Sequence, residues 1–294
     1  MQKITPHVWF DKEAKEAAEY YTSIFENSEI KNITTLHDTP SGDAVTVNLT
    51  LMGQEFMFIS AGPYFKVNPS ISFLVAVKTR DEVEYVWKML SDGGQALMEL
   101  GEYPFSEKYG WIQDKYGLSW QIMFVDNRKI KQNITPTLMF VGDVCGKTEE
   151  AIQFYASVFY DATIGEILRY EEGEEPDKVG TIKHVSFSLE GFELAAMDSA
   201  LKHEFSFNEA ISFIVNCNNQ DEIDYYWGKL SALPEAEQCG WLKDKYGISW
   251  QIVPSMMSDL LSTKDEKRAQ RVTEAFLKMK KFDIKTLRKA YEGT

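Results

Sequence analysis

A few polar side chains lie inside otherwise apolar, strand-like runs, where they could bind or orient a small molecule. Gln121 and Gln251 each have apolar neighbours on both sides, so an inward-facing amide would be a hydrogen-bonding group in a cavity. The alternative is an amide half-buried in a sheet. His7 is either a strand histidine at an edge or a metal ligand or base. Asp198, beside Met197, is either a cavity carboxylate or a solvated strand end.

Aromatic residues accompany these polar groups. Trp9 follows His7 in the same strand-like run and is a further candidate for the wall of a binding cavity. Four tryptophans recur in pairs: Trp111, Trp120, Trp241 and Trp250. Residues of this type either line a hydrophobic pocket or form the core of a β-sheet. Both alternatives stay open at the level of the sequence.

Composition and charge exclude several classes of partner. The chain has 294 residues with 45 acidic and 31 basic side chains, a net charge of −14. Such an acidic protein repels a phosphate backbone, so nucleic acid is not an expected partner. The excess is uneven, because residues 255–294 carry ten basic and six acidic residues. This basic tail either docks on the acidic body or recruits a partner.

Cysteine usage and hydropathy predict a cytoplasmic protein. Cys145, Cys217 and Cys239 form no CxxC pair, so a zinc knuckle has no support, and an odd count does not describe a disulfide framework. The first residues lack the apolar core of a signal peptide. No apolar run approaches the roughly 18 residues of a membrane span, so no membrane partner is expected.

The chain contains two copies of one sequence. Residues 110–122 (GWIQDKYGLSWQI) return as residues 240–252 (GWLKDKYGISWQI), with ten of thirteen positions identical. Residues 4–6 return as residues 134–136 at the same offset of 130. A period this long predicts domains that each bury a core, not solenoid repeats. We therefore predict two homologous domains, at residues 1–127 and 132–254, joined near residues 128–132.

Hydrophobic periodicity predicts an α+β fold of four βαβββ modules. In the first copy, strands are expected over residues 4–10, 30–36, 44–51 and 55–61, with a helix over 12–25. The pattern recurs with strands over 71–77, 96–100, 111–113 and 119–124 and a helix over 80–90. The second copy repeats both modules but loses residues where the first has 93–107. Residues 255–294 form a tail with helices predicted over 265–281 and 284–291.

Several motifs of the chain resemble those of a known protein superfamily. The paired modules, the aromatic pairs Tyr20-Tyr21 and Phe154-Tyr155, and the closing Asp-x-x-Gly-x-x-Trp-x-Ile hairpin resemble the vicinal oxygen chelate superfamily. Residues 208–213 (NEAISF), 239–247 (CGWLKDKYG), 249–254 (SWQIVP) and the tail over 275–293 resemble its PhnB-like branch, also labelled 3-demethylubiquinone methyltransferase-like. The resemblance implies sheets that curl around shared cavities. It also implies a pseudo-symmetric pair of domains within the chain, with a higher oligomer left open.

The resemblance further implies a divalent metal, held by His, Glu or Gln on the first and last strands of the modules. The first-strand positions fall near Pro6, Ser70, Pro136 and Ala210, none of which is a metal ligand. Gln121 and Gln251 take the place of the ligand glutamate, and a fourth position falls near Ser60 in one domain and Asp198 in the other. No domain collects three good ligands. The sequence therefore predicts no cofactor, although a metal is possible.

These observations favour a protein that binds a small-molecule ligand in an apolar, aromatic cavity. The candidate cavity residues are His7, Trp9, Ser60, Gln121, Asp198 and Gln251. One alternative is a metal-dependent lyase, isomerase or dioxygenase of the same superfamily. Methyl transfer, suggested by the label of the branch, is disfavoured because the chain lacks a GxGxxG loop and alternating βα units. Whether the chain is an enzyme stays open.

Overall fold

A computed structural model describes residues 2–126, 130–263 and 265–294. The expected connector between the copies falls partly on residues 127–129, which lie outside the described residues. The first copy contains β1 (Ile4–Phe10), α1 (Ala14–Ile24), β2 (Glu29–Thr39), β3 (Gly42–Leu51), β4 (Gln54–Ser60), β5 (Ile71–Val77), α2 (Arg80–Ser91), β6 (Gln95–Tyr103), β7 (Ser106–Gln113) and β8 (Ser119–Phe124).

The second copy and the tail continue the series. The second copy contains β9 (Ile134–Phe140), η1 (Gly142–Val144), α3 (Thr148–Val158), β10 (Thr163–Arg169), β11 (Ile182–Leu189), β12 (Phe192–Asp198), β13 (Ile211–Cys217), α4 (Gln220–Leu230), η2 (Pro234–Ala236), β14 (Trp241–Lys243) and β15 (Ser249–Pro254). The tail contains α5 (Met257–Leu261), α6 (Glu266–Phe276) and α7 (Ile284–Glu292). The predicted α+β architecture of tandem repeats with a helical tail is confirmed.

Each of the two sheets takes one module from each copy. Sheet A has the order β14-β15-β13-β1-β4-β3-β2, and sheet B has the order β10-β11-β12-β9-β5-β8-β7-β6. The copies meet through antiparallel pairs, β1 with β13 and β5 with β9, which place His7 opposite Ser212 and Ser72 opposite Thr137. Equivalent modules therefore occupy equivalent places in the two sheets.

The fourth module has one strand fewer than the other three. Where the first copy forms β6 and the start of β7, residues 231–240 form η2 and a single bridge between Gln238 and Trp241. The shorter sequence in this region leaves no chain for a further strand. Within the described part of the chain, sheet A consequently has seven strands and sheet B has eight.

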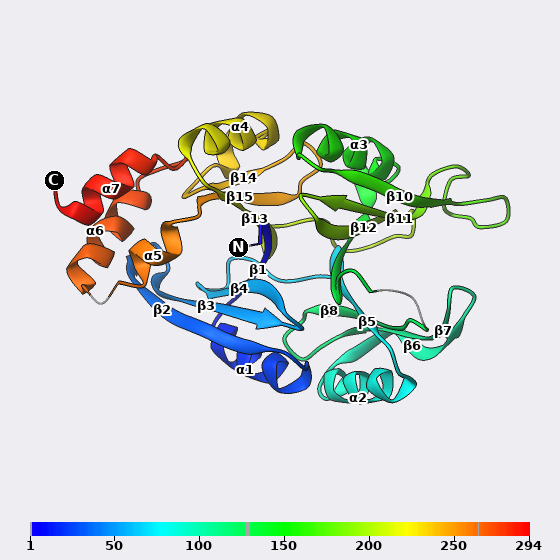
Figure 1. The fold of residues 1–294 in the computed structure, drawn as a ribbon. Coiled ribbons are helices and arrows are strands. Elements are labelled where there is room, and N and C mark those ends of the chain that lie inside the picture. The colour runs from blue at the N-terminus through cyan, green and yellow to red at the C-terminus, as the bar shows by residue number, and fades with distance from the viewer. Residues whose placement is uncertain (1, 127–129, 264) are drawn as a thin grey trace.

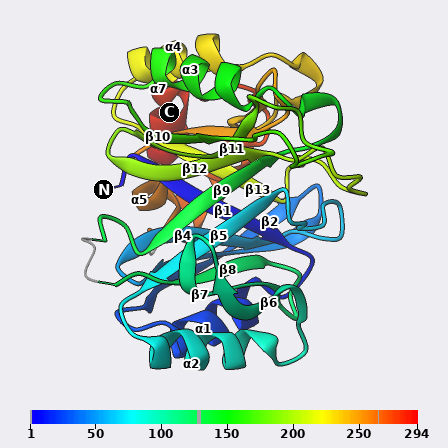
Figure 2. The ribbon, with the colours of Figure 1, turned by 90° about the vertical axis from the view of Figure 1, so that its right-hand side faces the viewer.

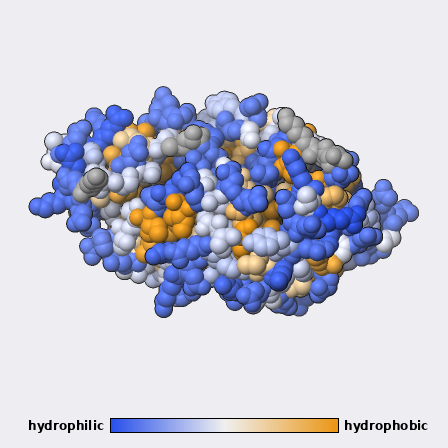
Figure 3. Space-filling model, turned by 60° about the horizontal axis from the view of Figure 1, so that its bottom comes forward, coloured by the Kyte–Doolittle hydropathy of each residue, from blue (hydrophilic) through white to orange (hydrophobic). Residues whose placement is uncertain are grey.

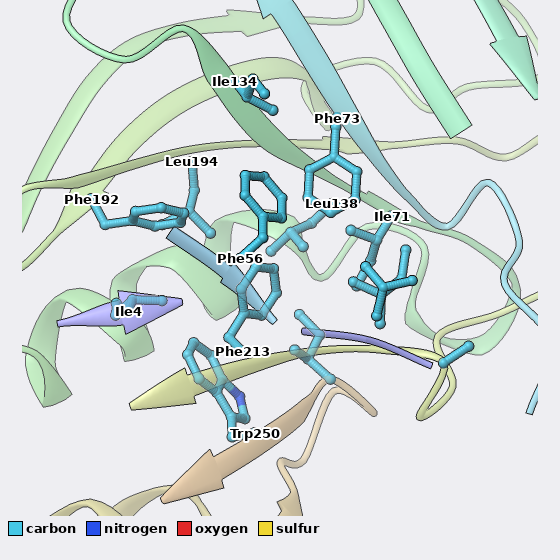
Figure 4. Packing of buried hydrophobic residues seen from close by; sticks show 14 of the residues in the cluster. Ile4, Phe56, Ile71, Phe73, Ile134, Leu138, Phe192, Leu194, Phe213 and Trp250 are labelled. Carbon is cyan, nitrogen blue, oxygen red and sulfur yellow. The ribbon is translucent and has the colours of Figure 1, made fainter. Parts of the chain in front are cut away.

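The inner faces of the two sheets meet in a shared core of buried apolar side chains (Figure 4). We call the opposite face of each sheet its outer face. Phe56 of β4 packs against Phe73 of β5 with ring centroids 5.5 Å apart, which joins sheet A to sheet B. Helices α1 and α2 lie together on one side of this core, and α3 and α4 lie on the opposite side (Figures 1 and 2). The surface on the α1 and α2 side is mostly hydrophilic, with apolar side chains in scattered groups (Figure 3).

Local sequence explains the helices that cover the core. In α1 the buried residues Ala14, Ala17, Ala18, Tyr21 and Ile24 recur at three- and four-residue steps. Helix α2 begins at a capping box, in which the Thr79 side chain accepts from the Glu82 N–H and the Glu82 side chain accepts from the Thr79 N–H. These signals place both helices where the sequence predicts them.

The tail lies beside the outer face of sheet A, at the opposite end of the molecule from the β6–β7 and β10–β11 hairpins (Figure 1). The helix predicted over 265–281 ends earlier, at Phe276, because the following segment bonds to the end of sheet A. The Cys239 N–H donates to the Met279 carbonyl (2.8 Å), and the Gly240 N–H donates to the Lys280 carbonyl (2.7 Å). Gly293 ends α7 in the left-handed conformation, as its position predicts. No described helix is long and apolar enough to cross a membrane.

Candidate functional site in the outer face of sheet A

The repeated hairpin motif divides into a structural part and a surface-facing part. Asp114 accepts from the Tyr21 hydroxyl (2.6 Å) and the Trp120 indole N–H (2.8 Å), and from the N–H groups of Tyr116 and Leu118. Burial raises the pKa of the Asp114 carboxyl, although all of these donors oppose the shift. This aspartate therefore anchors the turn and α1.

Asp244 repeats this arrangement in the second copy. Its carboxylate accepts from the Tyr155 hydroxyl (2.7 Å), the Trp250 indole N–H (2.9 Å) and the backbone of Tyr246 and Ile248. The tryptophan next to each motif glutamine is core, since Trp120 and Trp250 are buried against aromatic rings of the inner faces. Of the other two tryptophans, Trp241 lines a cavity on the outer face of sheet A, whereas Trp111 lies opposite Gln121 on the outer face of sheet B and donates to Ser119.

Strand alternation sends the other motif side chains to the outer faces. In sheet A these side chains line a cavity of about 850 Å³, which we call the hollow. Its floor comes from β1, β4, β13 and β15, including His7, Trp9 and Gln251, and its cover includes Phe276, Leu277 and Phe282 of the tail. The volume is in the range of sites for drug-sized ligands.

A short chain of neutral polar groups crosses the floor of the hollow. The Gln251 amide donates through Nε2 to Ser212 Oγ (3.0 Å), and Ser212 Oγ lies 3.3 Å from His7 Nδ1. His7 is 1% exposed, and burial lowers its pKa to about 3, so the imidazole is neutral at pH 7. Trp241 packs edge-on against the His7 ring at 5.2 Å. Trp9 is oriented by an indole hydrogen bond to the Gly62 carbonyl (2.8 Å).

Two acceptors in the hollow lack donors from the described part of the chain. Ser249 Oγ is fully buried and has no hydrogen-bond partner. Gln251 Oε1 also receives no hydrogen bond from any described residue, since only its Nε2 is engaged. Ser249 Oγ is enclosed by the protein, whereas Gln251 Oε1 is open to the hollow and is a position that a ligand donor could satisfy.

The outer face of sheet B uses the same residues differently. Gln121 donates to Ser72 Oγ (2.7 Å), and its Oε1 accepts from the Tyr109 hydroxyl (2.7 Å). The Trp111 indole N–H donates to Ser119 Oγ (2.7 Å), the counterpart of Ser249. Both groups that lack a described partner in sheet A therefore have one in sheet B.

The remaining two candidates do not lie in the hollow. Ser60 faces α1, where its hydroxyl accepts from the Ala14 N–H (2.9 Å). Asp198 accepts from the Gly146 N–H (2.7 Å), from the Thr148 N–H and hydroxyl, and from the Ile182 N–H (3.0 Å). Each polar group thus fixes the start of a helix from the inner face. The structure brings together His7, Trp9 and Gln251, and separates them from Gln121, Ser60 and Asp198.

The sequence alone did not single out Ser212, Ser249 or the tail residues of the hollow. Ser249 lies in the repeated motif, so its identity with Ser119 was visible, but its lack of a partner depends on the orientation of Trp241. The tail residues could have been suggested by the apolar face of the helix that contains Phe276. Their place over sheet A is a tertiary feature without a local signal.

The donor set of the hollow does not fit a divalent metal. No group of three His, Cys, Asp or Glu side chains that could hold a metal occurs among residues 2–126, 130–263 and 265–294. The hollow offers one imidazole and one amide oxygen near each other, whereas resident divalent metals require three or more converging ligands.

Comparison with known proteins supports this architecture. A family model described as 3-demethylubiquinone-9 3-methyltransferase matches residues 2–123 and again residues 132–253. Glyoxalase I from Zea mays is 13% identical and aligns over 86% of this chain and 94% of its own, with a TM-score of 0.54. A proposed dioxygenase from Bacillus subtilis is 10% identical over 98% of this chain and 94% of its own, with a TM-score of 0.51.

The PhnB protein from Bacillus cereus is 40% identical over 42% of this chain and all of its own, with a TM-score of 0.40. None of the curated proteins matches the chain. The sheets and the structural likenesses define a protein of the vicinal oxygen chelate fold. The chain belongs to the PhnB-like family described as 3-demethylubiquinone-9 3-methyltransferase, with two tandem copies.

Proposed function

We propose that the chain is a small-molecule-binding protein and that the hollow of sheet A is its binding site. The observation that carries this proposal is Gln251 Oε1, an acceptor that receives no hydrogen bond from any described residue, on the floor of a cavity of about 850 Å³. An apolar wall with a few oriented polar groups is the usual composition of a ligand pocket. A cytoplasmic location is part of the proposal, and the three free cysteines support it.

The alternatives have less support from the described residues. A metal-dependent lyase, isomerase or dioxygenase would need ligands that the hollow does not assemble. A conventional methyltransferase would need a glycine-rich strand-to-helix loop at the edge of a doubly wound parallel sheet, and sheets A and B have a different topology. The description of the family names an activity that this geometry does not explain.

A matched pair of variants tests the location of the site. Ile59 of β4 lines the hollow, and Met197 occupies the equivalent place on β12, since Ile59 pairs with Trp9 and Met197 pairs with Met139. We expect wild-type protein and Met197→Trp to bind the neutral dye Nile red with increased fluorescence, and Ile59→Trp to lose most of this signal. Equal signals from both variants, or no dye binding by the wild type, would overturn the proposal.

A further inference from the structure

The outer face of sheet B indicates which chemical group of a ligand would fit beside the motif glutamine. In sheet B, Tyr109 stands two residues before Trp111 and places its hydroxyl on Gln121 Oε1 at 2.7 Å. Its ring is nearly buried and packs against Tyr103 and Phe105. A phenol ring and its hydroxyl thus occupy the space next to the motif glutamine.

In sheet A no tyrosine stands at the equivalent position, and Gln251 lines the hollow. The residue equivalent to Tyr109 is Cys239, and the backbone turns away at Gly240 with a φ of +83°. Cys239 is directed to the tail, because its N–H donates to Met279 and its thiol contacts the Leu277 carbonyl at 3.9 Å. No described side chain replaces the tyrosine hydroxyl at Gln251 Oε1.

A second difference lies beside the same glutamine, at Ser249. In sheet B the indole of Trp111 donates to Ser119, whereas Trp241 packs against His7 and Trp9 and does not donate to Ser249. The Ser249 hydroxyl, which is 1% exposed, is left without a partner. The Gln251 oxygen, which lines the hollow, is therefore the acceptor available to a bound molecule, whereas the Ser249 hydroxyl is enclosed by the protein.

The charges around the hollow select against an anion. Lys31 is the one Lys or Arg among the described lining residues, and it pairs with Glu29. The acidic lining residues include Glu55, Glu209 and Glu235, of which Glu209 pairs with Lys243 at 2.7 Å. An anionic ligand would lose its hydration without gaining a free cation, which is unfavourable in an apolar site.

We infer that the hollow binds an uncharged aromatic ligand whose ring hydroxyl donates to Gln251 Oε1, in the place that Tyr109 occupies in sheet B. This inference rests on the proposed function and specifies the ligand of that site.

The test compares three related probes on the wild-type chain at pH 7 by isothermal titration calorimetry. 2-Naphthol has an uncharged ring hydroxyl, 2-methoxynaphthalene has the same rings without an O–H donor, and 2-naphthoate is an anion. We expect 2-naphthol to bind about tenfold more tightly than 2-methoxynaphthalene, the factor typical of one hydrogen bond, and 2-naphthoate to bind most weakly. Equal affinity of the first two, or tightest binding of 2-naphthoate, would overturn the inference.

A pair of variants assigns the effect to one residue. Gln251→Met removes the acceptor at similar volume and should abolish the preference for 2-naphthol over 2-methoxynaphthalene, whereas Gln121→Met in sheet B should retain it. Retention of the preference in Gln251→Met would contradict the inference. If the naphthalene probes do not distinguish the hydroxyl while Ile59→Trp still removes Nile red binding, the inference fails and the proposed function stands. If Nile red binding is independent of Ile59, the proposed function fails first.

Discussion

The outer faces of sheets A and B start from the same repeated motif and reach different states. Both keep a glutamine that donates to a serine on the neighbouring strand, at 3.0 Å for Gln251 and 2.7 Å for Gln121. In sheet B, side chains of the protein satisfy the other acceptors of the motif. In sheet A, the loss of one strand and the addition of the tail convert the same motif into the floor of a hollow.

The exchange of His7 for Thr137 is a further difference between the faces. His7 reaches Ser212 in sheet A, whereas Thr137 Oγ1 in sheet B is buried without a partner. Among the described residues, sheet B therefore retains one unsatisfied hydroxyl. Its glutamine has no free acceptor for a ligand, because Gln121 Oε1 already accepts from Tyr109. The comparison indicates that the cores of the two copies stayed alike while their outer faces diverged.

The largest loss of stability should come from replacing the buried aspartate that the two copies share. Asp114→Ala and Asp244→Ala each leave buried donors from a tyrosine, a tryptophan and two backbone groups without an acceptor. We expect each variant to lower the free energy of unfolding by about 3–5 kcal/mol, measured by urea denaturation. A loss below about 1 kcal/mol in only one of them would show that the two cores are not equivalent.

A substitution that makes the outer face of sheet B resemble that of sheet A should cause a smaller loss of stability. Tyr109→Ala removes the ring that occupies the space beside Gln121, and we expect a loss of about 3 kcal/mol in the free energy of unfolding. Added 4-methylphenol, the side chain of tyrosine as a free molecule, should raise the unfolding temperature of this variant more than that of the wild type. The double variant Tyr109→Ala, Gln121→Met serves as the control.

That control should lose the additional response to 4-methylphenol, because it lacks the acceptor at Gln121. An equal rise in unfolding temperature for the wild type and Tyr109→Ala would mean that the phenol does not enter the space left by Tyr109. The analogy between this ring and a ligand of the hollow would then be without support.

The sequence predicted local elements well and their assembly less well. The strands expected over 4–10, 71–77 and 119–124 match β1, β5 and β8, because apolar periodicity and turn residues act locally. The same periodicity does not specify which strand is a neighbour, so the mixing of copies within each sheet was not predictable. The identity of the 110–122 and 240–252 motifs likewise conceals their different outer faces.

The candidate site was predictable in part for the same reason. His7, Trp9 and Gln251 share one face of sheet A, while Ser60 and Asp198 face inward, and a one-residue shift along a strand decides between these outcomes. The cover of the hollow depends on how the tail docks, which involves contacts between residues far apart in the sequence. Such contacts leave no short-range pattern.

The third prediction concerns the pH dependence of stability that His7 adds to sheet A. Because its pKa falls from 6.5 to about 3 on folding, the unfolded chain binds a proton below pH 6.5 that the folded chain does not. The contribution of the neutral imidazole to the free energy of unfolding is complete above pH 6.5 and is lost as the pH falls toward 3. Between pH 7.5 and pH 5 the wild type should lose about 2 kcal/mol more than His7→Thr, which carries the residue of sheet B.

Denaturation curves for both proteins at these two pH values measure this difference, because the two proteins share every ionisable group except His7. Parallel losses in the wild type and His7→Thr would mean that the imidazole titrates normally. In that case the floor of the hollow would be wetter than its burial indicates.

The smallest effect should come from the charge difference between the basic tail and the acidic body. Lys281 pairs with Asp224 at 2.5 Å and Lys280 with Glu237 at 3.3 Å, but both lysines are partly exposed. Exposed ion pairs are screened and contribute little, so Lys280→Ala with Lys281→Ala should change the free energy of unfolding by less than about 1 kcal/mol. Urea denaturation at low and high salt measures this change. A larger, salt-sensitive loss would mean that charge, and not the buried side chains of Phe276 and Phe282, holds the tail over sheet A. The difference between the outer faces of the two sheets would then depend on ion pairs.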